Sequence, residues 1–260
     1  MAENTAMQFT NGVSTDTQHT EHKSPSDVEE KVEQLLARMT LEEKVGQLIQ
    51  VGQHWRAPED ADDPRASIET YIRAGQVGSI LSIRDVKAIN RLQKVAVEES
   101  RLGIPLIIGN DVIHGYRTIF PIPLAESCTW DPDLLEHAAH IAAEEAAASG
   151  TDWIFAPMVD ICRDPRWGRI AEGAGEDPML GQAMARARVR GFQAIDLLGE
   201  RKIVACPKHY VAYGGAEAGK DYNTVDVSER TLRDVYLPPF KAAFDAGAGS
   251  VMSAFNEING

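Results

Sequence analysis

The sequence predicts an α/β fold built on a parallel sheet. Short, unbroken apolar runs, several of them rich in β-branched residues, alternate with longer segments of helical periodicity. The runs recur at spacings of about 25 to 50 residues, which is typical of βα units rather than hairpins. Five strands are expected, at residues 77–81, 104–108, 153–159, 203–206 and 249–255. A sixth at 47–51 stays open, because helical periodicity from Leu41 could also run through it.

The expected helices are marked by their start signals. Capping boxes at 26–29 and 40–43 precede helical periodicity, and Asp-Pro pairs at 131–132 and 177–178 join an N-cap to a proline in the first turn. Helices are expected at 28–39, 67–74, 86–95, 132–150, 177–198 and 228–246. The last contains Pro238-Pro239 and should be interrupted there.

Composition narrows the class of protein. The chain has 260 residues, 43% hydrophobic and 25% charged, which fits a globular protein with one folded domain at residues 25–260. Residues 1–24 are polar and predict a disordered tail. The net charge is −13 and no basic stripe occurs, so nucleic acid is not an expected partner. No run approaches the ~18 apolar residues of a membrane span.

The N-terminus and the cysteines bear on the cellular compartment. Residues 1–23 lack the basic-then-apolar layout of a signal peptide, which predicts a cytoplasmic protein and leaves a periplasmic location open. Cys128, Cys162 and Cys206 are widely spaced and odd in number, which indicates free thiols. Cys206 lies inside an apolar strand and should be inert core.

Polar side chains follow several expected strands. Asp111 follows the strand at 104–108, Lys208 and His209 follow the strand at 203–206, and Asn256 follows the last strand. A polar cluster, 163–169, follows the strand at 153–159. Ligands bind at the carboxyl ends of strands in α/β folds, so these groups are expected on one face. A carboxylate, cations and an aromatic ring together suit a neutral ligand rich in hydroxyl groups.

Each of these residues also has a structural interpretation. Asp111 could cap the segment after its strand, and the Lys-His pair could be solvated surface. Arg166 and Arg169 could pair with nearby acids (Glu172, Glu176 and Asp177), Trp167 could be core, and His114 could be a satisfied loop histidine. No metal site is expected. No cofactor is expected either, and the sequence has no phosphate-binding Gly loop. The G-x-S-x-G motif of a serine nucleophile is also absent.

The motifs at these strand ends resemble those of glycoside hydrolase family 3, most closely its bacterial periplasmic-type β-glucosidases. The resemblance covers roughly residues 25–260. The matching stretches, in the family's order, are 110–115 (NDVIHG), 156–160 (APMVD), 163–169 (RDPRWGR), 172–173 (EG), 175–178 (GEDP), 208–210 (KHY), 213–214 (YG) and 221–226 (DYNTVD).

The resemblance implies a TIM-like (β/α)8 barrel and retaining hydrolysis of terminal β-D-glucosyl residues. It assigns the sugar subsite beside the cleaved bond to Asp111, Arg169, Lys208, His209, Met252 and Phe255. Many members have Tyr at the place of Phe255, so a hydroxyl contact there is lost or supplied elsewhere. The loop 214–223 has no His, which disfavours the family's β-N-acetylglucosaminidase branch.

The catalytic carboxyl groups are not expected within these 260 residues. Retaining hydrolysis needs two carboxyl groups about 5–5.5 Å apart. In the family the nucleophile Asp lies on the following strand and the acid/base Glu on a second domain, both beyond Gly260. With five or six strands the barrel is incomplete. The chain is therefore expected to be an N-terminal part, inactive alone, whose partners are a β-glucoside or oligosaccharide and the remaining strands and second domain.

Two other functions stay open. One is a sugar-binding remnant without catalysis, which fits the residues present. The other is a Schiff-base aldolase that uses Lys208 as nucleophile, since barrel aldolases place a Lys at a strand end. The 163–169 cluster has no task in an aldolase, which disfavours it.

Overall fold

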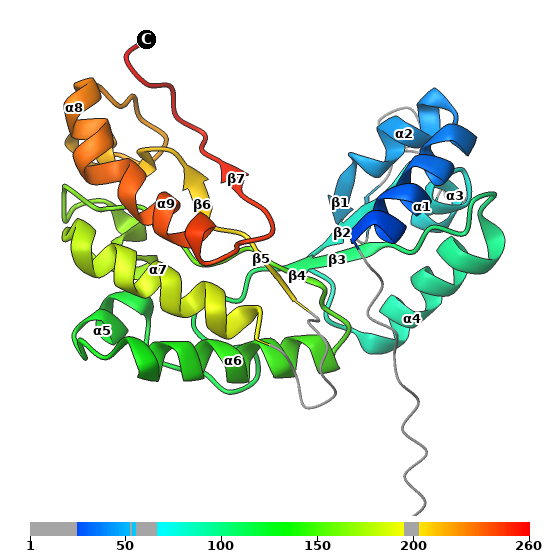
Figure 1. The fold of residues 1–260 in the computed structure, drawn as a ribbon, viewed down its shortest axis with the longest axis horizontal. Helices are drawn as coiled ribbons and strands as arrows, with labels where there is room; N and C mark the ends of the chain where they lie inside the picture. Colours follow the sequence, from blue (N-terminus) through cyan, green and yellow to red (C-terminus); the bar gives the residue numbers. More distant parts are fainter. Residues whose placement is uncertain (1–24, 53, 56–66, 195–202) are drawn as a thin grey trace, which may run out of the picture. The chain divides into compact units, whose positions relative to one another are not determined.

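The structure is a computed structural model that describes residues 25–52, 54–55, 67–194 and 203–260. The expected tail at 1–24, most of the 54–63 loop and the last residues of the helix expected to reach 198 lie outside these ranges. The chain divides into two units, one that ends at Thr40 and one that begins at Leu41. In the first, helix α1 spans Pro25–Arg38, which agrees with the expected helix at 28–39 except that it begins three residues earlier and ends one residue earlier (Figure 1).

The second unit is built on a parallel sheet of five strands. They are β1 (Gln50–Gly52), β2 (Ser79–Leu81), β3 (Ile107–Asn110), β4 (Trp153–Ile154) and β5 (Val204–Ala205). Their order in space is their order in the chain, and every neighbouring pair is parallel (Figure 1). This is the arrangement of part of a (β/α)8 barrel. The open sixth strand exists as β1, and the helix before it, α2 (Leu41–Gln47), also forms.

Helices connect the strands. Those with a start signal in the sequence begin at it, whereas the helix at 123–127 was not predicted. They are α3 (Ile68–Arg73), α4 (Val86–Lys94), α5 (Pro123–Ser127), α6 (Pro132–Ala148), α7 (Pro178–Phe192), α8 (Glu229–Thr231) and α9 (Leu237–Asp245). The Asp131 carboxylate accepts the Leu134 N–H at 3.1 Å, and Asp177 accepts the Met179 N–H at 2.6 Å. Each Asp-Pro pair therefore caps its helix as expected. Helix α7 ends at Phe192, short of the expected 198.

The interruption expected at Pro238-Pro239 is present, but it precedes the prolines. Residues 232–236 between α8 and α9 form a π-helical turn. Both prolines lie in the first turn of α9, where a backbone N–H has no helical partner to lose. The widened turn lets the chain enter α9 with its prolines at tolerated positions.

Strands β4 and β5 are shorter than expected. Pro157 cannot donate a hydrogen bond to a neighbouring strand, so regular pairing of β4 stops at Ile154. Backbone bonds nevertheless continue: Lys208 N–H donates to Pro157 O at 3.0 Å, and Val159 N–H donates to Lys208 O at 2.9 Å. Residues 208–210, expected to follow a strand, form a further strand, β6 (Lys208–Tyr210). It pairs in parallel with β7 (Met252–Ser253), all that forms of the strand expected at 249–255.

The two largest of the apolar clusters among the described residues lie on either side of the β3–β4 pair. One joins β1–β3 to α3 and α4, with Ile80 and Leu92 fully buried. The other joins β4 and β5 to α6, α7 and α9, which pack side by side in Figure 1 and bury Ile154, Val189 and Phe240. Burial of each such side chain contributes about 1.5–3 kcal/mol.

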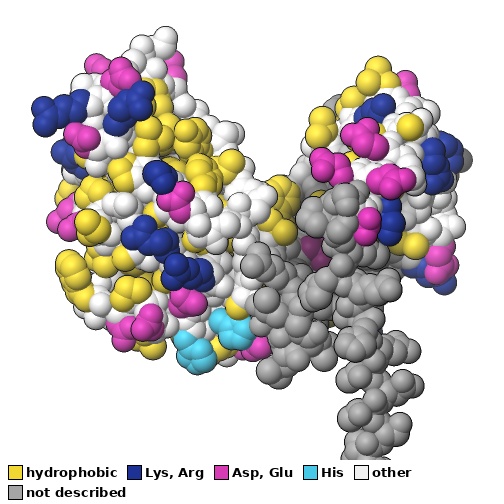
Figure 2. Space-filling view, viewed as in Figure 1, with side chains coloured by type: hydrophobic (Ala, Val, Ile, Leu, Met, Phe, Trp, Pro, Cys, Tyr) yellow, Lys and Arg dark blue, Asp and Glu magenta, His cyan; other side chains and the backbone are white. Residues whose placement is uncertain are grey.

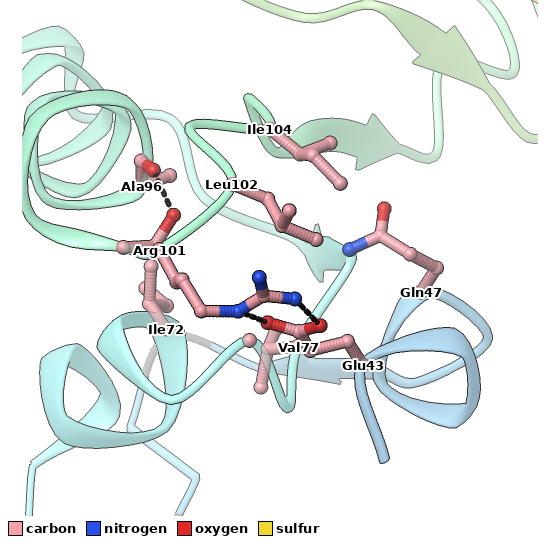
Figure 3. A pocket seen from close by; sticks show the side chains of 10 residues that line it. Glu43, Gln47, Ile72, Val77, Ala96, Arg101, Leu102 and Ile104 are labelled. Carbon is pink, nitrogen blue, oxygen red and sulfur yellow. Dashed lines mark hydrogen bonds and ion pairs between the residues drawn. The ribbon is translucent and has the colours of Figure 1, made fainter. Parts of the chain in front are cut away.

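An ion pair closes a small pocket at the amino ends of the first strands (Figure 3). Its lining residues are Glu43, Gln47, Ile72, Gly75, Val77, Ala96, Ser100, Arg101, Leu102 and Ile104. Gln47 precedes β1, Val77 precedes β2 and Ile104 precedes β3, so the pocket lies at the amino ends of these strands. The Arg101 guanidinium donates through Nε to Glu43 Oε1 at 2.8 Å and through Nη2 to Glu43 Oε2. In barrel folds this end contributes stability, while the opposite end holds ligands.

The described residues carry charged side chains of both signs on the surface (Figure 2), and their cysteines are unpaired. On the face in Figure 2, basic side chains are interspersed with acidic ones. Among the described residues, no helix has the length and apolar content needed to cross a bilayer. Cys128, Cys162 and Cys206 are free thiols, and Cys206 is fully buried as expected.

Candidate functional site

A salt bridge joins the carboxyl end of β3 to β6. Asp111 directly follows β3, and its Oδ1 accepts a hydrogen bond from Lys208 Nζ at 2.6 Å. The Lys208 side chain is 4% exposed, whereas Asp111 is 52% exposed. Surface solvation therefore does not explain Lys208, and the Asp111 carboxylate contacts a lysine rather than capping the next segment. The pair presents a half-exposed carboxylate held by a buried cation.

His209, the next residue, is held by a carboxylate from the segment after β4. Asp160 Oδ2 lies 2.9 Å from His209 Nδ1 and accepts the His209 backbone N–H at 3.0 Å. Both side chains are buried. Burial raises the pKa of Asp160, while hydrogen bonds and charge from His209 oppose that shift.

Arg169 lies in the 3-10 turn Gly168–Glu172. Its Nε and Nη2 donate to the two carboxylate oxygens of Glu172, at 2.7 and 3.0 Å, and this ion pair raises the pKa of Arg169. The guanidinium carbon lies 5.6 Å from the ring centre of Tyr213. The pairing of Arg169 with Glu172 confirms one structural interpretation. For Arg166 the same interpretation is not supported, because Arg166 pairs with Asp164, at 2.6 Å.

Aromatic rings gather around His209. The His209 ring centre lies 5.1 Å from that of Tyr213 and 6.1 Å from that of Phe255. Tyr222 lies 5.4 Å from Phe255, and both are exposed, Phe255 by 64%. Trp167 is buried against Tyr213, which confirms its interpretation as core. The exposed rings offer an apolar surface beside the polar groups, of the kind that can cover one face of a sugar ring.

Asp221 ties two of these rings together. Its Oδ1 accepts hydrogen bonds from Tyr213 Oη at 2.6 Å and from Trp167 Nε1 at 2.9 Å. Burial, followed by the hydrogen bond to Asp221, raises the pKa of Tyr213 to about 12. Burial also opposes ionisation of Asp221, but the hydrogen bonds from Tyr213 and Trp167 outweigh it and lower the pKa of Asp221. Tyr213 is therefore fixed as a neutral donor to an ionised carboxylate.

The six residues predicted for the site lie in one connected group. Lys208 contacts Asp111 and is the register partner of Met252 on β7. His209 and Phe255 are ring neighbours, and Arg169 joins them through Tyr213, which contacts both.

Two other polar residues have structural roles. Asn256 donates to the backbone oxygens of Val211 and Glu257, each at 3.3 Å. His114 Nδ1 lies 2.9 Å from Phe120 O, which confirms it as a satisfied loop histidine. Neither reaches the group around Lys208 and His209 through any described contact.

Sequence reasoning did not assign roles to Asp160, Tyr213 and Asp221. A signal for Asp160 was present: it is a single acid within the otherwise apolar, buried run 154–162. Such an acid needs a buried partner. Tyr213 and Asp221 had no comparable signal, because a Tyr-Asp pair eight residues apart is common in loops.

The described residues offer no metal site: they contain no group of three or more His, Cys, Asp or Glu side chains that could hold a metal ion. What the arrangement offers is a half-exposed carboxylate, buried and partly buried cations, a histidine and exposed rings. Groups of these kinds together can form hydrogen bonds to hydroxyl groups and cover an apolar ring face.

Comparison with known proteins identifies the class. Residues 40–260 match the family described as the glycosyl hydrolase family 3 N terminal domain. The chain therefore belongs to glycoside hydrolase family 3, and its sheet is part of that family's N-terminal (β/α)8 barrel domain.

The chain is similar to β-glucosidases within the family. It is 42% identical to the periplasmic beta-glucosidase of Salmonella typhimurium, over 88% of this chain and 29% of the relative. A beta-xylosidase of Formosa agariphila is 31% identical, over 93% of this chain and 29% of the relative. The beta-glucosidase from Listeria innocua in complex with isofagomine is 40% identical, with a TM-score of 0.79, over 88% of this chain and 32% of that one. The same enzyme has been solved with glucose and, as a mutant, with laminaribiose. The chain thus spans about a third of the length of these relatives.

Proposed function

We propose that residues 41–260 supply the sugar subsite of a retaining β-glucosidase, the subsite that holds the terminal β-D-glucosyl residue. The observation that carries this proposal is the Asp111–Lys208 pair. A carboxylate that is 52% exposed is held at 2.6 Å by a lysine that is 4% exposed, at the carboxyl ends of the strands. Burying an ammonium is costly unless a partner compensates, so this lysine serves to position the carboxylate.

Each polar group has a task towards a sugar. Among the described residues, only Lys208 donates to the Asp111 carboxylate, so Oδ2 can accept hydrogen bonds from ring hydroxyls. Lys208 keeps two further N–H groups to donate to hydroxyl oxygens, and the Arg169 guanidinium, paired with Glu172, supplies positive charge beside them. Phe255 covers the apolar side of the ring. These contacts strengthen as the ring flattens towards an oxocarbenium-like transition state.

We also propose that the 260-residue polypeptide binds sugar without hydrolysing it. Retaining hydrolysis uses a nucleophile and an acid/base, and the resemblance to the family places both after residue 260. Three carboxylates near the site are engaged by other side chains: Asp160 by His209, Asp221 by Tyr213 and Trp167, and Glu172 by Arg169. The fourth, Asp111, is the one proposed above to bind ring hydroxyls. The similarity to β-glucosidases and to a complex with glucose supports glucose as the bound sugar.

The aldolase alternative is disfavoured by the same pair. A lysine that attacks a carbonyl carbon needs its Nζ directed at that carbon. The Nζ of Lys208 is instead directed at Asp111 Oδ1, 2.6 Å away, and its side chain is 4% exposed.

A chimera tests the proposal. Residues 41–260 replace the matching segment of the Salmonella typhimurium periplasmic beta-glucosidase, and hydrolysis of 4-nitrophenyl β-D-glucoside is measured. We expect turnover, and we expect Asp111→Asn to lower kcat/KM about 100-fold, the effect of losing one preorganised charged contact. The matched control is Asp245→Asn, which removes a carboxylate that is 58% exposed and 2.5 Å from Lys241. It should leave kcat/KM unchanged.

Three outcomes would contradict the proposal. A folded Asp111→Asn chimera with undiminished kcat/KM would remove Asp111 from the subsite. A clear preference for 4-nitrophenyl β-D-xyloside would assign the subsite to xylose. Glucoside turnover by the polypeptide 1–260, abolished by Asp111→Ala, would show that the catalytic carboxyl groups lie within it.

A further inference from the structure

Asp160 is a fully buried carboxylate whose two oxygens differ in their hydrogen bonds. Its side chain has no exposed surface. Two hydrogen bonds, from His209 Nδ1 at 2.9 Å and from the His209 backbone N–H at 3.0 Å, converge on the single oxygen Oδ2. Among the described residues, Oδ1 has no hydrogen-bond partner. Asp160 therefore cannot touch a ligand, and all of its hydrogen bonds go to His209.

The contacts indicate where the hydrogens lie. Oδ2 accepts the backbone N–H, and a proton placed on Oδ1 would have no acceptor among the described residues. A carboxylate is acceptor-only when ionised, and two donors converging on one oxygen suit that form. Nδ1 of His209 is then the donor, and it carries the hydrogen. Burial raises the pKa of Asp160, and the hydrogen bonds from His209 and the Arg169 charge oppose that shift without reversing it; the assignment of the hydrogen to Nδ1 therefore rests on the geometry of the two donors.

The other ring nitrogen of His209 is left for a ligand. Nε2 lies across the ring from the nitrogen that contacts Asp160, and no described residue forms a hydrogen bond with it. The ring is held between Tyr213, at 5.1 Å between ring centres, and the exposed Phe255, at 6.1 Å. His209 also follows Lys208, whose ammonium contacts Asp111.

We propose that Asp160 is a positioning residue that fixes His209 in the form with hydrogen on Nδ1, so that Nε2 of the neutral ring accepts a hydrogen bond from a ligand hydroxyl. A carboxylate that orients a histidine through Nδ1–H and leaves Nε2 to react or bind is a recurrent device. The identity of the ligand rests on the proposed function. The state of His209 in the free protein does not.

The test reads the two ring nitrogens directly. The 260-residue chain is labelled with ¹⁵N-histidine, and two-bond ¹H–¹⁵N spectra are recorded at about pH 8, with His209 assigned by His209→Asn. We expect hydrogen on Nδ1 and a bare Nε2. His114 is an internal standard, because Nδ1 contacts a carbonyl oxygen and must be its donor. A His209 with hydrogen on Nε2 and a bare Nδ1 in the unmodified chain overturns the proposal.

Variants separate positioning from a merely structural role. Asp160→Asn keeps an oxygen that can accept both bonds, so His209 should keep hydrogen on Nδ1. Asp160→Ala removes the acceptor, and the His209 signals should move to a mixture of the two forms while those of His114 stay. An Asp160→Ala chain that folds and keeps hydrogen wholly on Nδ1 also overturns the proposal. If Asp160→Ala does not fold, the unmodified chain and Asp160→Asn still decide it.

A titration with isofagomine distinguishes this proposal from the proposed function. A shift of the His209 Nε2 signal, absent with Asp111→Asn, is expected if both hold. Hydrogen on Nδ1 with no response to isofagomine contradicts the sugar subsite and leaves the positioning role standing. Hydrogen on Nε2 in a chain that still binds isofagomine refutes the positioning role alone.

Discussion

Removing one partner of the buried ion pair between Glu126 and Arg188 should cost the folded chain several kcal/mol. Their side chains are 9% and 7% exposed, and Arg188 Nη2 donates to Glu126 Oε2. Arg188 Nη1 also donates to Ile113 O at 2.8 Å, two residues after Asp111. Burial lowers the pKa of Arg188, and Glu126 opposes the shift by holding the charged form. The pair thus ties α7 to the segment that carries the candidate site.

The perturbation is Arg188→Met, which keeps much of the side-chain volume and removes the charge. It leaves the Glu126 carboxylate buried without its cation, a change that costs about 3–5 kcal/mol. The hydrogen bond to Ile113 O is lost with it and lies within that range, because the contributions of one network do not add. Glu126→Leu should cost a similar amount. The double variant should cost less than either single change, since no uncompensated charge remains.

Urea unfolding of the 260-residue chain, followed by far-UV circular dichroism, measures these free energies. Lys241→Met is the control, since it breaks a surface pair with Asp245 that should be worth at most about 1 kcal/mol. If Arg188→Met costs no more than Lys241→Met, or if the two single changes simply add in the double variant, the reasoning from burial is wrong.

Two further predictions concern Tyr213 and the loop that follows it. A tyrosine whose pKa is raised to about 12 in the folded chain keeps its proton where the unfolded chain loses it, near pH 10. The contribution of Tyr213 to stability is therefore present below pH 10 and falls between pH 10 and about 12. The difference in 295 nm absorbance between the unmodified chain and Tyr213→Phe should titrate with a midpoint near 12. A midpoint near pH 10 would contradict this prediction. Gly214→Ala should destabilise the chain by about 1–3 kcal/mol in urea unfolding, because the new Cβ would lie 2.2 Å from Ile161 O. Gly168→Ala, whose Cβ would meet nothing within 4 Å, should be near neutral, and equal effects of the two changes would refute the steric argument.

The sequence predicted the elements whose signals are local. Apolar runs located β2 to β5 and left β1 undecided between strand and helix. The Asp-Pro pairs located the starts of α6 and α7, since a cap needs only residues within one turn. Strand β6 was not predicted, because Lys208-His209-Tyr210 is polar and is held by backbone bonds to residues 157–159 and by β7. The π-helical turn before α9 was also missed, because periodicity cannot tell where a proline-containing helix changes its hydrogen-bond pattern.

The sequence predicted the part of the candidate site that follows from the topology of a parallel sheet. The ends of parallel strands share one face, and this placed Asp111 and Lys208 together although they are 97 residues apart. The contact between Asp160 and His209 depends instead on how the chain runs after β4, beyond the regular strand, where no pattern fixes the register.

The two carboxylates beside Lys208 and His209 differ in exposure, and the difference assigns their tasks. Asp111 is half-exposed, so a ligand hydroxyl can replace water at its free oxygen at little cost in desolvation. Asp160 is sealed, so it acts only through the histidine that it holds. Loss of the Asp111 charge should therefore change ligand affinity without altering the ring nitrogens of His209. Loss of the Asp160 acceptor should change those nitrogens first and affinity only as a consequence. A variant at either position that produced the opposite order would show that exposure does not divide the two roles.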